Sequence, residues 1–145
     1  MPQTITIGTK DLVAAAEREI ETLPVEEAVK LAGRDDTVLV DIRDIRELQR
    51  DGKVPGAFHC PRGMLEFWID PQSSYHKPVF AQDKRYVFFC AGGLRSALAA
   101  HTAHIMGLKP VAHIKGGFGA WKKAGGPVEA PEPKPDTKAD AATKS

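Results

Sequence analysis

The feature that most constrains the fold is a short, wholly apolar run that leads through a glycine turn into a helical pattern. Tyr86–Phe89 lacks the polar alternation of a half-exposed strand, so it predicts a strand buried on both faces. Residues 90–93, a cysteine, an alanine and two glycines, follow it, and a helical pattern runs from Leu94 to Met106. This order is typical of a sheet whose faces are covered by helices.

The same order, a strand followed by a helical pattern, recurs along the amino-acid sequence. Charged strand ends at Asp41 and Arg43 precede a helical pattern, as Cys90 does. This arrangement predicts an α/β domain with a mainly parallel sheet, in which ligands bind beyond the carboxyl ends of the strands. Further strands are expected at 38–42, 57–59 and 111–114, and further helices at 9–21, 25–32, 45–50, 63–70 and 116–121.

Size and charge narrow the function classes. The 145 residues fit one domain, and the net charge of +1 gives no reason to expect nucleic acid as a partner. No apolar run is long enough to cross a bilayer, and the start of the chain lacks the pattern of a signal peptide. Two cysteines are too few for a disulfide framework, so we expect a cytoplasmic protein. We divide the chain into a helical extension (1–19), a folded domain (20–128) and a disordered Pro-, Lys- and Ala-rich tail (129–145).

The cysteine turn has a definite chemistry. Successive backbone N–H groups in such a turn point inward, and the following helix N-terminus adds partial positive charge. An anion or a thiolate is stabilised there, so Cys90 is the candidate nucleophile. No histidine base is required if the turn itself stabilises the thiolate. His101 and His104 share a helix face but lack further ligands, so no metal site is expected.

At this point four segments resemble single-domain rhodaneses, the thiosulfate sulfurtransferase family. Residues 90–96 read Cys-x-x-Gly-x-Arg-Ser, which is similar to the active-site loop of that family. Residues 40–47, 53–57 and 116–121 resemble three further family segments in order and spacing. The resemblance covers about residues 20–127.

The resemblance implies a rhodanese-like fold, a mainly parallel five-stranded sheet with helices on both faces. It implies that sulfur passes from thiosulfate or a persulfide donor, including a protein persulfide, to cyanide or a thiol through a persulfide on Cys90. No cofactor is implied. The expected anion cradle consists of Ala91, Gly92, Gly93, Leu94, Arg95 and Ser96. Asp41 and Arg43 are expected in supporting positions, either as a strand-end pair that organises the local backbone or with a direct role in catalysis. Arg95 is expected to organise the loop, by orienting loop carbonyls or by pairing with Asp41 or another acid.

Two alternatives remain. Cysteine-dependent phosphatases place five residues between cysteine and arginine, whereas four separate Cys90 from Arg95 here. The shorter loop favours sulfur over a phosphatase or arsenate reductase reaction. A rhodanese-fold binding or sensor module without turnover is the second alternative, and the retained cysteine argues against it.

The segment from 62 to 84 is longer and more aromatic than a minimal rhodanese needs. Arg62, Phe67 and Trp68 either form a wall over the Cys90 pocket or belong to a core-packing helix. Because the loop itself supplies no extra cation for a sulfonate, Arg43 and Arg62 are the candidates for one. Cys60 is interpreted as structural, with sulfur acceptance from Cys90 as the alternative.

Overall fold

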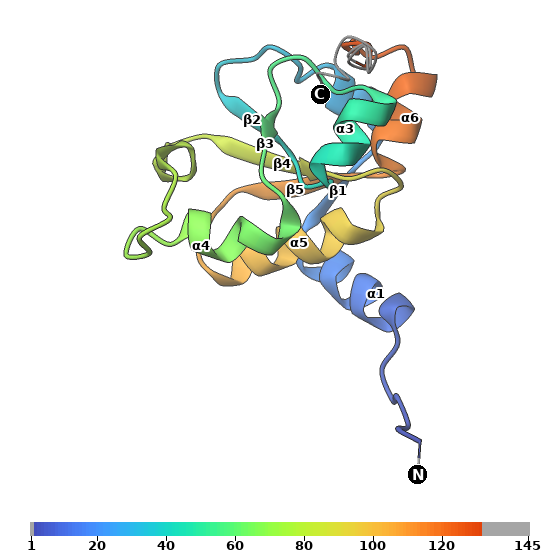
Figure 1. Cartoon of the computed structure of the whole chain (residues 1–145), viewed down its shortest axis with the longest axis vertical. Helices are drawn as coiled ribbons and strands as arrows, with labels where there is room; N and C mark the ends of the chain where they lie inside the picture. Colours follow the sequence, from blue (N-terminus) through green and yellow to red (C-terminus); the bar gives the residue numbers. More distant parts are fainter. Residues whose placement is uncertain (1, 132–145) are drawn as a thin grey trace, which may run out of the picture.

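The computed structural model describes residues 2–131 and confirms the expected α/β fold (Figure 1). Five parallel strands form one sheet in the order β1-β5-β4-β2-β3. β4, which carries the apolar run, lies at the centre, and its residues Tyr86 to Phe89 are buried as expected. The strands are β1 (Glu21–Leu23), β2 (Thr37–Asp41), β3 (Phe58–His59), β4 (Arg85–Phe89) and β5 (Val111–Ile114).

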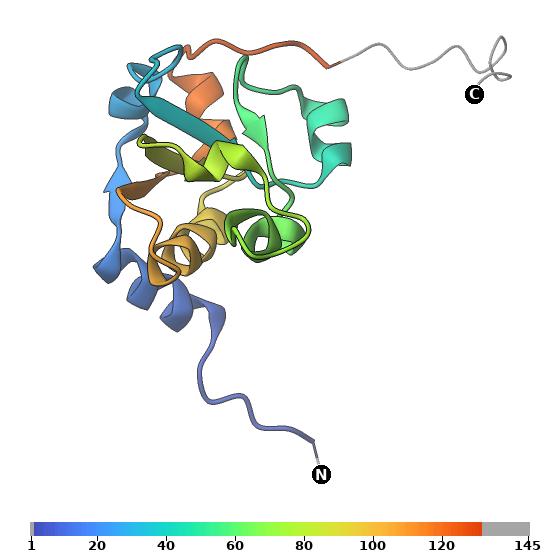
Figure 2. The same ribbon diagram turned by 90° about the vertical axis from the view of Figure 1, so that its left-hand side faces the viewer.

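Helices cover both faces of the sheet (Figures 1 and 2). α4 and α5 pack on one face, around a core that includes Leu65, Phe80 and Phe88. α2 and α6 lie on the other face, around a core that includes Ala28, Phe89 and Trp121. The helices are α1 (Thr9–Glu19), α2 (Val25–Val29), α3 (Ile45–Asp51), α4 (Leu65–Ile69), α5 (Leu94–Ile105) and α6 (Gly117–Lys123), with short 3₁₀ turns η1 (Arg62–Met64) and η2 (Pro78–Ala81).

The register of β2 and β4 sets the position of the site. Asp41, the last residue of β2, pairs with Phe89, which directly precedes Cys90. The backbone N–H of Ile42 then donates to the carbonyl of Phe89 across 3.0 Å. The ends of β2 and β4, marked by Asp41 and Cys90, therefore lie side by side at the carboxyl edge of the sheet.

One strand differs from the expectation. The helix predicted over 9–21 ends at Glu19, and β1 follows it, parallel to β5 with Thr22 opposite His113. Glu21 and Thr22 are polar and form an edge strand, so their strand conformation results from pairing with β5 rather than from an apolar pattern. α1 packs against α5, so the N-terminal extension lies next to the helix whose first turn belongs to the candidate site.

The last described residues run back along the domain. Glu129 and Lys53 exchange backbone hydrogen bonds of 2.7 and 3.1 Å, so the chain remains paired one residue into the tail predicted at 129–145. Residues 132–145 of that tail lie outside the described residues. Between residues 2 and 131, the helices are too short or too polar to cross a bilayer.

Candidate functional site

Cys90 follows the central strand and is 1% exposed. The backbone N–H groups of Gly93 and Ser96 point at its sulfur, with N···Sγ distances of 3.2 and 3.4 Å. Ala91, Gly92 and Leu94 are exposed around the buried thiol. The loop from Cys90 to Ser96 thus presents a sulfur atom held by two backbone donors at the start of α5, an arrangement that favours an anion.

Backbone conformation and α6 together fix this loop. Gly93 has a φ of +100°, in the left-handed region, whereas Gly92 does not adopt a positive φ. The N–H of Phe118 donates to the carbonyl of Cys90 across 2.8 Å. Gly117 has a φ of +60°, and a Cβ there would overlap the backbone of Cys90 and Ala91. The glycine-rich segment before Trp121 therefore forms the support beneath the cysteine loop.

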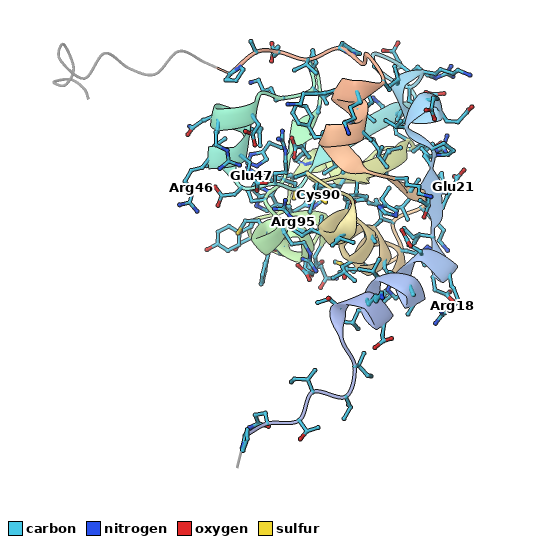
Figure 3. All side chains as sticks on the ribbon, turned by 90° about the vertical axis from the view of Figure 1, so that its right-hand side faces the viewer. Arg18, Glu21, Arg46, Glu47, Cys90 and Arg95 are labelled. Carbon is cyan, nitrogen blue, oxygen red and sulfur yellow. The ribbon has the colours of Figure 1, made fainter. Side chains whose placement is uncertain are left out.

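Arg95 pairs with Glu47 rather than Asp41. Its two terminal nitrogens donate to the two carboxylate oxygens of Glu47 across 2.9 and 3.0 Å. The hydrogen bond from Arg95 lowers the pKa of Glu47, and Glu47 in turn raises the pKa of Arg95. Figure 3 shows Cys90, Arg95 and Glu47 gathered in one region of the molecule. Arg95 thus joins the first turn of α5 to α3.

Asp41 and Arg43 form a buried ion pair with each other. Their side chains are at most 2% exposed, and the closest N···O distance is 2.7 Å. Arg43 also donates to the carbonyl of Gly52 across 3.0 Å and lies 4.3 Å from the ring centroid of Phe118. These contacts hold the loop after α3 against α6, which is a supporting position. Arg43 is therefore not a cation free to bind a sulfonate.

A polar chain that the sequence did not indicate runs away from the thiol. Ser96 Oγ lies 3.6 Å from Cys90 Sγ and 3.0 Å from Nδ1 of His113. Nε2 of His113 lies 2.9 Å from a carboxylate oxygen of Glu17 and 3.2 Å from the hydroxyl of Thr22. Burial lowers the pKa of His113, while the hydrogen bond and charge of Glu17 oppose that shift. The one sequence signal is a histidine inside an apolar strand, Val111–Ile114.

Arg62, Phe67 and Trp68 lie on the segment that leads into and through α4. Arg62 bonds to Glu66 across 3.0 Å and to Thr102 across 3.5 Å, about two turns along α5 from Ser96. Trp68 packs against the core, with its ring 5.8 Å from that of Phe58, and Phe67 is 52% exposed. These contacts favour the core-packing interpretation of Trp68, and a wall over the Cys90 pocket stays a prediction.

Cys60 differs from Cys90 in its surroundings. It is fully buried beside β2, where its N–H donates to the carbonyl of Asp41 across 2.9 Å. Burial raises the pKa of the Cys60 thiol to about 12. A thiol that stays protonated is a poor nucleophile, which agrees with a structural role. Within residues 2–131, groups of three or more side chains suited to holding a metal ion are absent.

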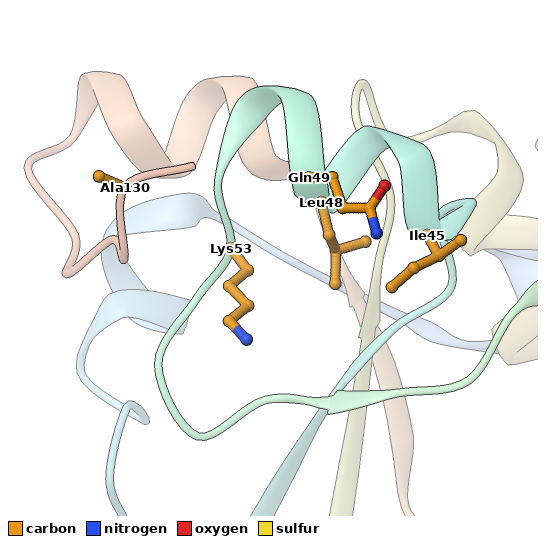
Figure 4. Close-up of a pocket in the computed structure, with 5 residues that line it drawn as sticks. All are labelled: Ile45, Leu48, Gln49, Lys53 and Ala130. Carbon is orange, nitrogen blue, oxygen red and sulfur yellow. The ribbon is translucent and has the colours of Figure 1, made fainter. Parts of the chain in front are cut away.

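Two hollows lie near these elements. One, of about 430 Å³, is lined by α1 residues including Val13 and Glu17 together with Leu94 of the cysteine loop. The other, of about 110 Å³, lies beside α3 between Leu48, Lys53 and Ala130 (Figure 4). The first hollow borders both the candidate site and the polar chain that ends at Glu17.

Comparisons with known proteins agree with the geometry. A match to the rhodanese-like domain covers residues 24–124. A sulfurtransferase of Allochromatium vinosum is 30% identical over 103 residues, which cover 71% of this chain and 88% of the relative. A mouse thiosulfate sulfurtransferase/rhodanese-like domain-containing protein 3 is 29% identical over 66% of this chain, and the match spans 64% of that relative's length.

Solved structures add two relatives. A Rhodopseudomonas palustris protein of unknown function, described as a possible tyrosine phosphatase, is 66% identical with a TM-score of 0.86, over 89% of this chain and 99% of its own. The polysulfide-sulfur transferase of Wolinella succinogenes is 31% identical with a TM-score of 0.63, over 83% and 85% of the two chains. The cysteine loop, the sheet order and the match across most of the folded domain lead to one conclusion: this chain belongs to the rhodanese-like domain family.

Proposed function

We propose that this chain is a sulfurtransferase that carries sulfane sulfur as a persulfide on Cys90. The observation that carries the proposal is the pair of backbone N–H groups, from Gly93 and Ser96, aimed at the Cys90 sulfur. Such donors stabilise a thiolate before the reaction and a persulfide anion after it. The membership in the rhodanese-like domain family and the relatives named as sulfurtransferases support the same reaction class.

In the first half-reaction, the Cys90 thiolate attacks the outer sulfur of the donor. A bond forms between Sγ and that sulfur, and the donor's own S–S bond breaks. With thiosulfate, the bonding electron pair leaves with sulfite; with a persulfide, it leaves with the donor thiolate. The product is a persulfide anion, Cys90–S–S⁻, within reach of the loop N–H groups.

In the second half-reaction, a thiophilic acceptor attacks the terminal sulfur of the persulfide. Cyanide becomes thiocyanate, or a thiolate becomes a new persulfide, and the electron pair of the broken S–S bond returns to Cys90 as thiolate. The described side chains need no cofactor for either step. Both cysteines are free thiols, which favours a reducing compartment such as the cytoplasm.

The charges around the cysteine loop help to decide which sulfur donor the site would prefer. Arg95 is engaged by Glu47 and Arg43 by Asp41, so neither is an unpaired cation for the sulfonate end of thiosulfate. The polysulfide-sulfur transferase of Wolinella succinogenes is a relative whose described substrate lacks a sulfonate. We therefore propose a persulfide or polysulfide as the preferred donor, with thiosulfate as a slower one.

A phosphatase is the competing activity, because the Rhodopseudomonas palustris relative is described as a possible tyrosine phosphatase. A phosphate monoester needs a loop wide enough for its three oxygens and an arginine that binds two of them. Here four residues separate Cys90 from Arg95, and both terminal nitrogens of Arg95 already donate to Glu47. Both features favour sulfur over phosphate.

Intact mass spectrometry tests the proposal directly. The protein is incubated with thiosulfate or with glutathione persulfide and measured before and after cyanide is added. We expect a gain of one sulfur atom that cyanide removes, present in the Cys60→Ser control and absent in Cys90→Ser. A protein that gains no sulfur from either donor and hydrolyses p-nitrophenyl phosphate instead would refute the proposed function.

A further inference from the structure

His113 is a buried imidazole with hydrogen bonds on both ring nitrogens. It is 1% exposed and lies in β5, next to the central strand that carries Cys90. Ser96 contacts Nδ1, and Glu17 and Thr22 contact Nε2. Four elements, α1, β1, β5 and α5, thus contribute to one polar chain that ends at the nucleophile. The sulfur-transfer steps above assign no role to it.

The chemistry of Glu17 fixes the direction of the hydrogen bonds. A carboxylate only accepts, so Nε2 of His113 carries the hydrogen that is donated to Glu17. In the neutral imidazole, Nδ1 is then an acceptor and receives the hydroxyl hydrogen of Ser96. Ser96 Oγ is left to accept from the Cys90 thiol, whose sulfur lies 3.6 Å away.

We propose that His113 is a positioning residue that takes up the proton of the Cys90 thiol through Ser96. The S–H bond of Cys90 breaks and its proton binds Ser96 Oγ, while the former hydroxyl proton of Ser96 moves to Nδ1 of His113. The electron pair of the S–H bond stays on Sγ, and no group is oxidised or reduced. The result is a thiolate beside the N–H groups of Gly93 and Ser96, and an imidazolium beside Glu17.

Burial favours the neutral form of His113, and the charge of Glu17 favours its protonated form. Because burial lowers its pKa, His113 remains neutral and its Nδ1 is free to accept until the thiol proton arrives. Glu17 on α1 is the charged group in contact with the ring, Thr22 on β1 is a neutral partner, and Cys90 faces it through Ser96.

Glu17, the member of this polar chain that lies farthest from Cys90, reaches the surface. The side chain of Glu17 is 38% exposed, and it lines the hollow of about 430 Å³ that Leu94 also borders. A proton held on His113 therefore has an exit to water that is separate from the sulfur atom. The inference rests on the proposed role of Cys90 as nucleophile, but it holds for any sulfur donor.

Alkylation of Cys90 by iodoacetamide tests the relay without any sulfur donor. The rate is followed against pH on the peptide that contains Cys90, in wild type, His113→Asn, Ser96→Ala and Glu17→Gln. Glu19→Gln is the matched control, because it removes the same charge from the same helix at an exposed position. Circular dichroism and thermal unfolding establish that each variant is folded, and Glu17→Gln carries the test if His113→Asn does not fold.

The expected signature is a change in the shape of the pH profile. His113→Asn and Ser96→Ala should react about tenfold more slowly than wild type near about pH 6, and the difference should vanish at alkaline pH, where hydroxide removes the thiol proton without the relay. Glu17→Gln should show a smaller loss in the same direction, and Glu19→Gln none. Unchanged profiles, or a loss of equal size at every pH, would overturn the relay.

The two proposals fail separately. If His113→Asn changes the alkylation profile and wild type forms no persulfide, sulfur transfer is wrong and the relay stands. If wild type forms a persulfide but alkylation does not respond to His113 or Glu17, the relay is wrong and sulfur transfer stands.

Discussion

Both carboxylate oxygens of Glu47 accept hydrogen bonds from the guanidinium group of Arg95, across 2.9 and 3.0 Å. This contact joins α3 to the first turn of α5 through two residues that are 48 positions apart in the sequence. A cation at a helix N-terminus is unfavourable against the helix dipole, so the acidic partner offsets that placement. The pair fixes the end of the cysteine loop.

Glu47→Gln should slow persulfide formation more than it destabilises the fold. The substitution leaves one hydrogen bond of the pair and removes its charge, and a partly exposed ion pair contributes roughly 1 kcal/mol or less to stability. We expect a roughly tenfold lower rate of persulfide formation because the loop end is freed. Stopped-flow measurement with Arg46→Gln as control checks this, since Arg46 lies on the same helix and is exposed. A Glu47→Gln rate equal to that of the control would contradict it.

At acid pH the fold should lose stability in part because Glu47 becomes protonated. Arg95 lowers the pKa of Glu47 in the folded protein, so its stabilising contribution is present above the ordinary glutamate range. That contribution is lost as the pH falls from the ordinary value through the lowered one. Urea unfolding followed against pH should show a shallower acid decline for Glu47→Gln than for wild type. Parallel declines would mean that Glu47 has no such linkage.

Gly117→Ala should strongly destabilise the protein. Gly117 has a φ of +60°, and an added Cβ would overlap the backbone of Cys90 and Ala91. Gly125 also has a positive φ, of +81°, but a Cβ there meets no atom within 4 Å. Gly125→Ala should therefore cost about 1 kcal/mol from backbone strain alone, and Gly117→Ala at least about 3 kcal/mol. Urea unfolding of the two variants makes the comparison, and equal losses would exclude a steric role for Gly117.

Asp41→Ala should cost about 3–5 kcal/mol, because it leaves the Arg43 guanidinium buried without its counter-charge. Asp36→Ala is the matched control, since it breaks an ion pair with Arg34 whose side chains are 57% and 63% exposed. Equilibrium unfolding measures both. If Asp41→Ala instead abolished persulfide formation at unchanged stability, Asp41 would belong to the chemistry rather than to the support.

A cation placed on the loop should improve the use of thiosulfate. Ala91 is exposed next to Cys90, and the neighbouring arginines are paired with acids. Ala91→Arg should lower the KM for thiosulfate about tenfold through a charge-assisted contact with the sulfonate, while the KM for a neutral-tailed persulfide stays the same. Steady-state kinetics with both donors, and Ala91→Gln as the uncharged control, check this. An equal change for both donors would show that charge is not the reason.

The sequence predicted those features of the fold that depend on neighbouring residues. β5 has the expected bounds, Val111–Ile114, and α5 begins at the expected Leu94, because apolar runs and glycine turns are local patterns. β1 was missed, because two of its three residues are polar and its strand conformation depends on pairing with β5. A three-residue edge strand has no pattern of its own in the sequence.

The contacts of the candidate site also differ in whether they could be predicted from the sequence. The cysteine loop is a run of consecutive residues, so a cradle from Ala91 to Ser96 could be predicted, but not that Gly93 and Ser96 are the residues whose N–H groups contact the sulfur. The partner of Arg95 could not, because Asp41 and Glu47 are both acids and the choice depends on how α3 packs. The contact between His113 and Glu17 joins residues that are 96 positions apart, and no local pattern indicates it.

The strand order has a consequence for how the molecule opens. Cys90 extends from β4, which is hydrogen-bonded on both sides, whereas Thr22 lies on the edge strand β1 and Glu17 on the helix just before it. Edge strands and terminal helices separate from a domain more readily than its central strand does. Fluctuations that detach α1 and β1 would therefore remove Glu17 from His113 while the cysteine loop remains folded, so amide exchange in α1 and β1 would report when His113 has lost its charged partner.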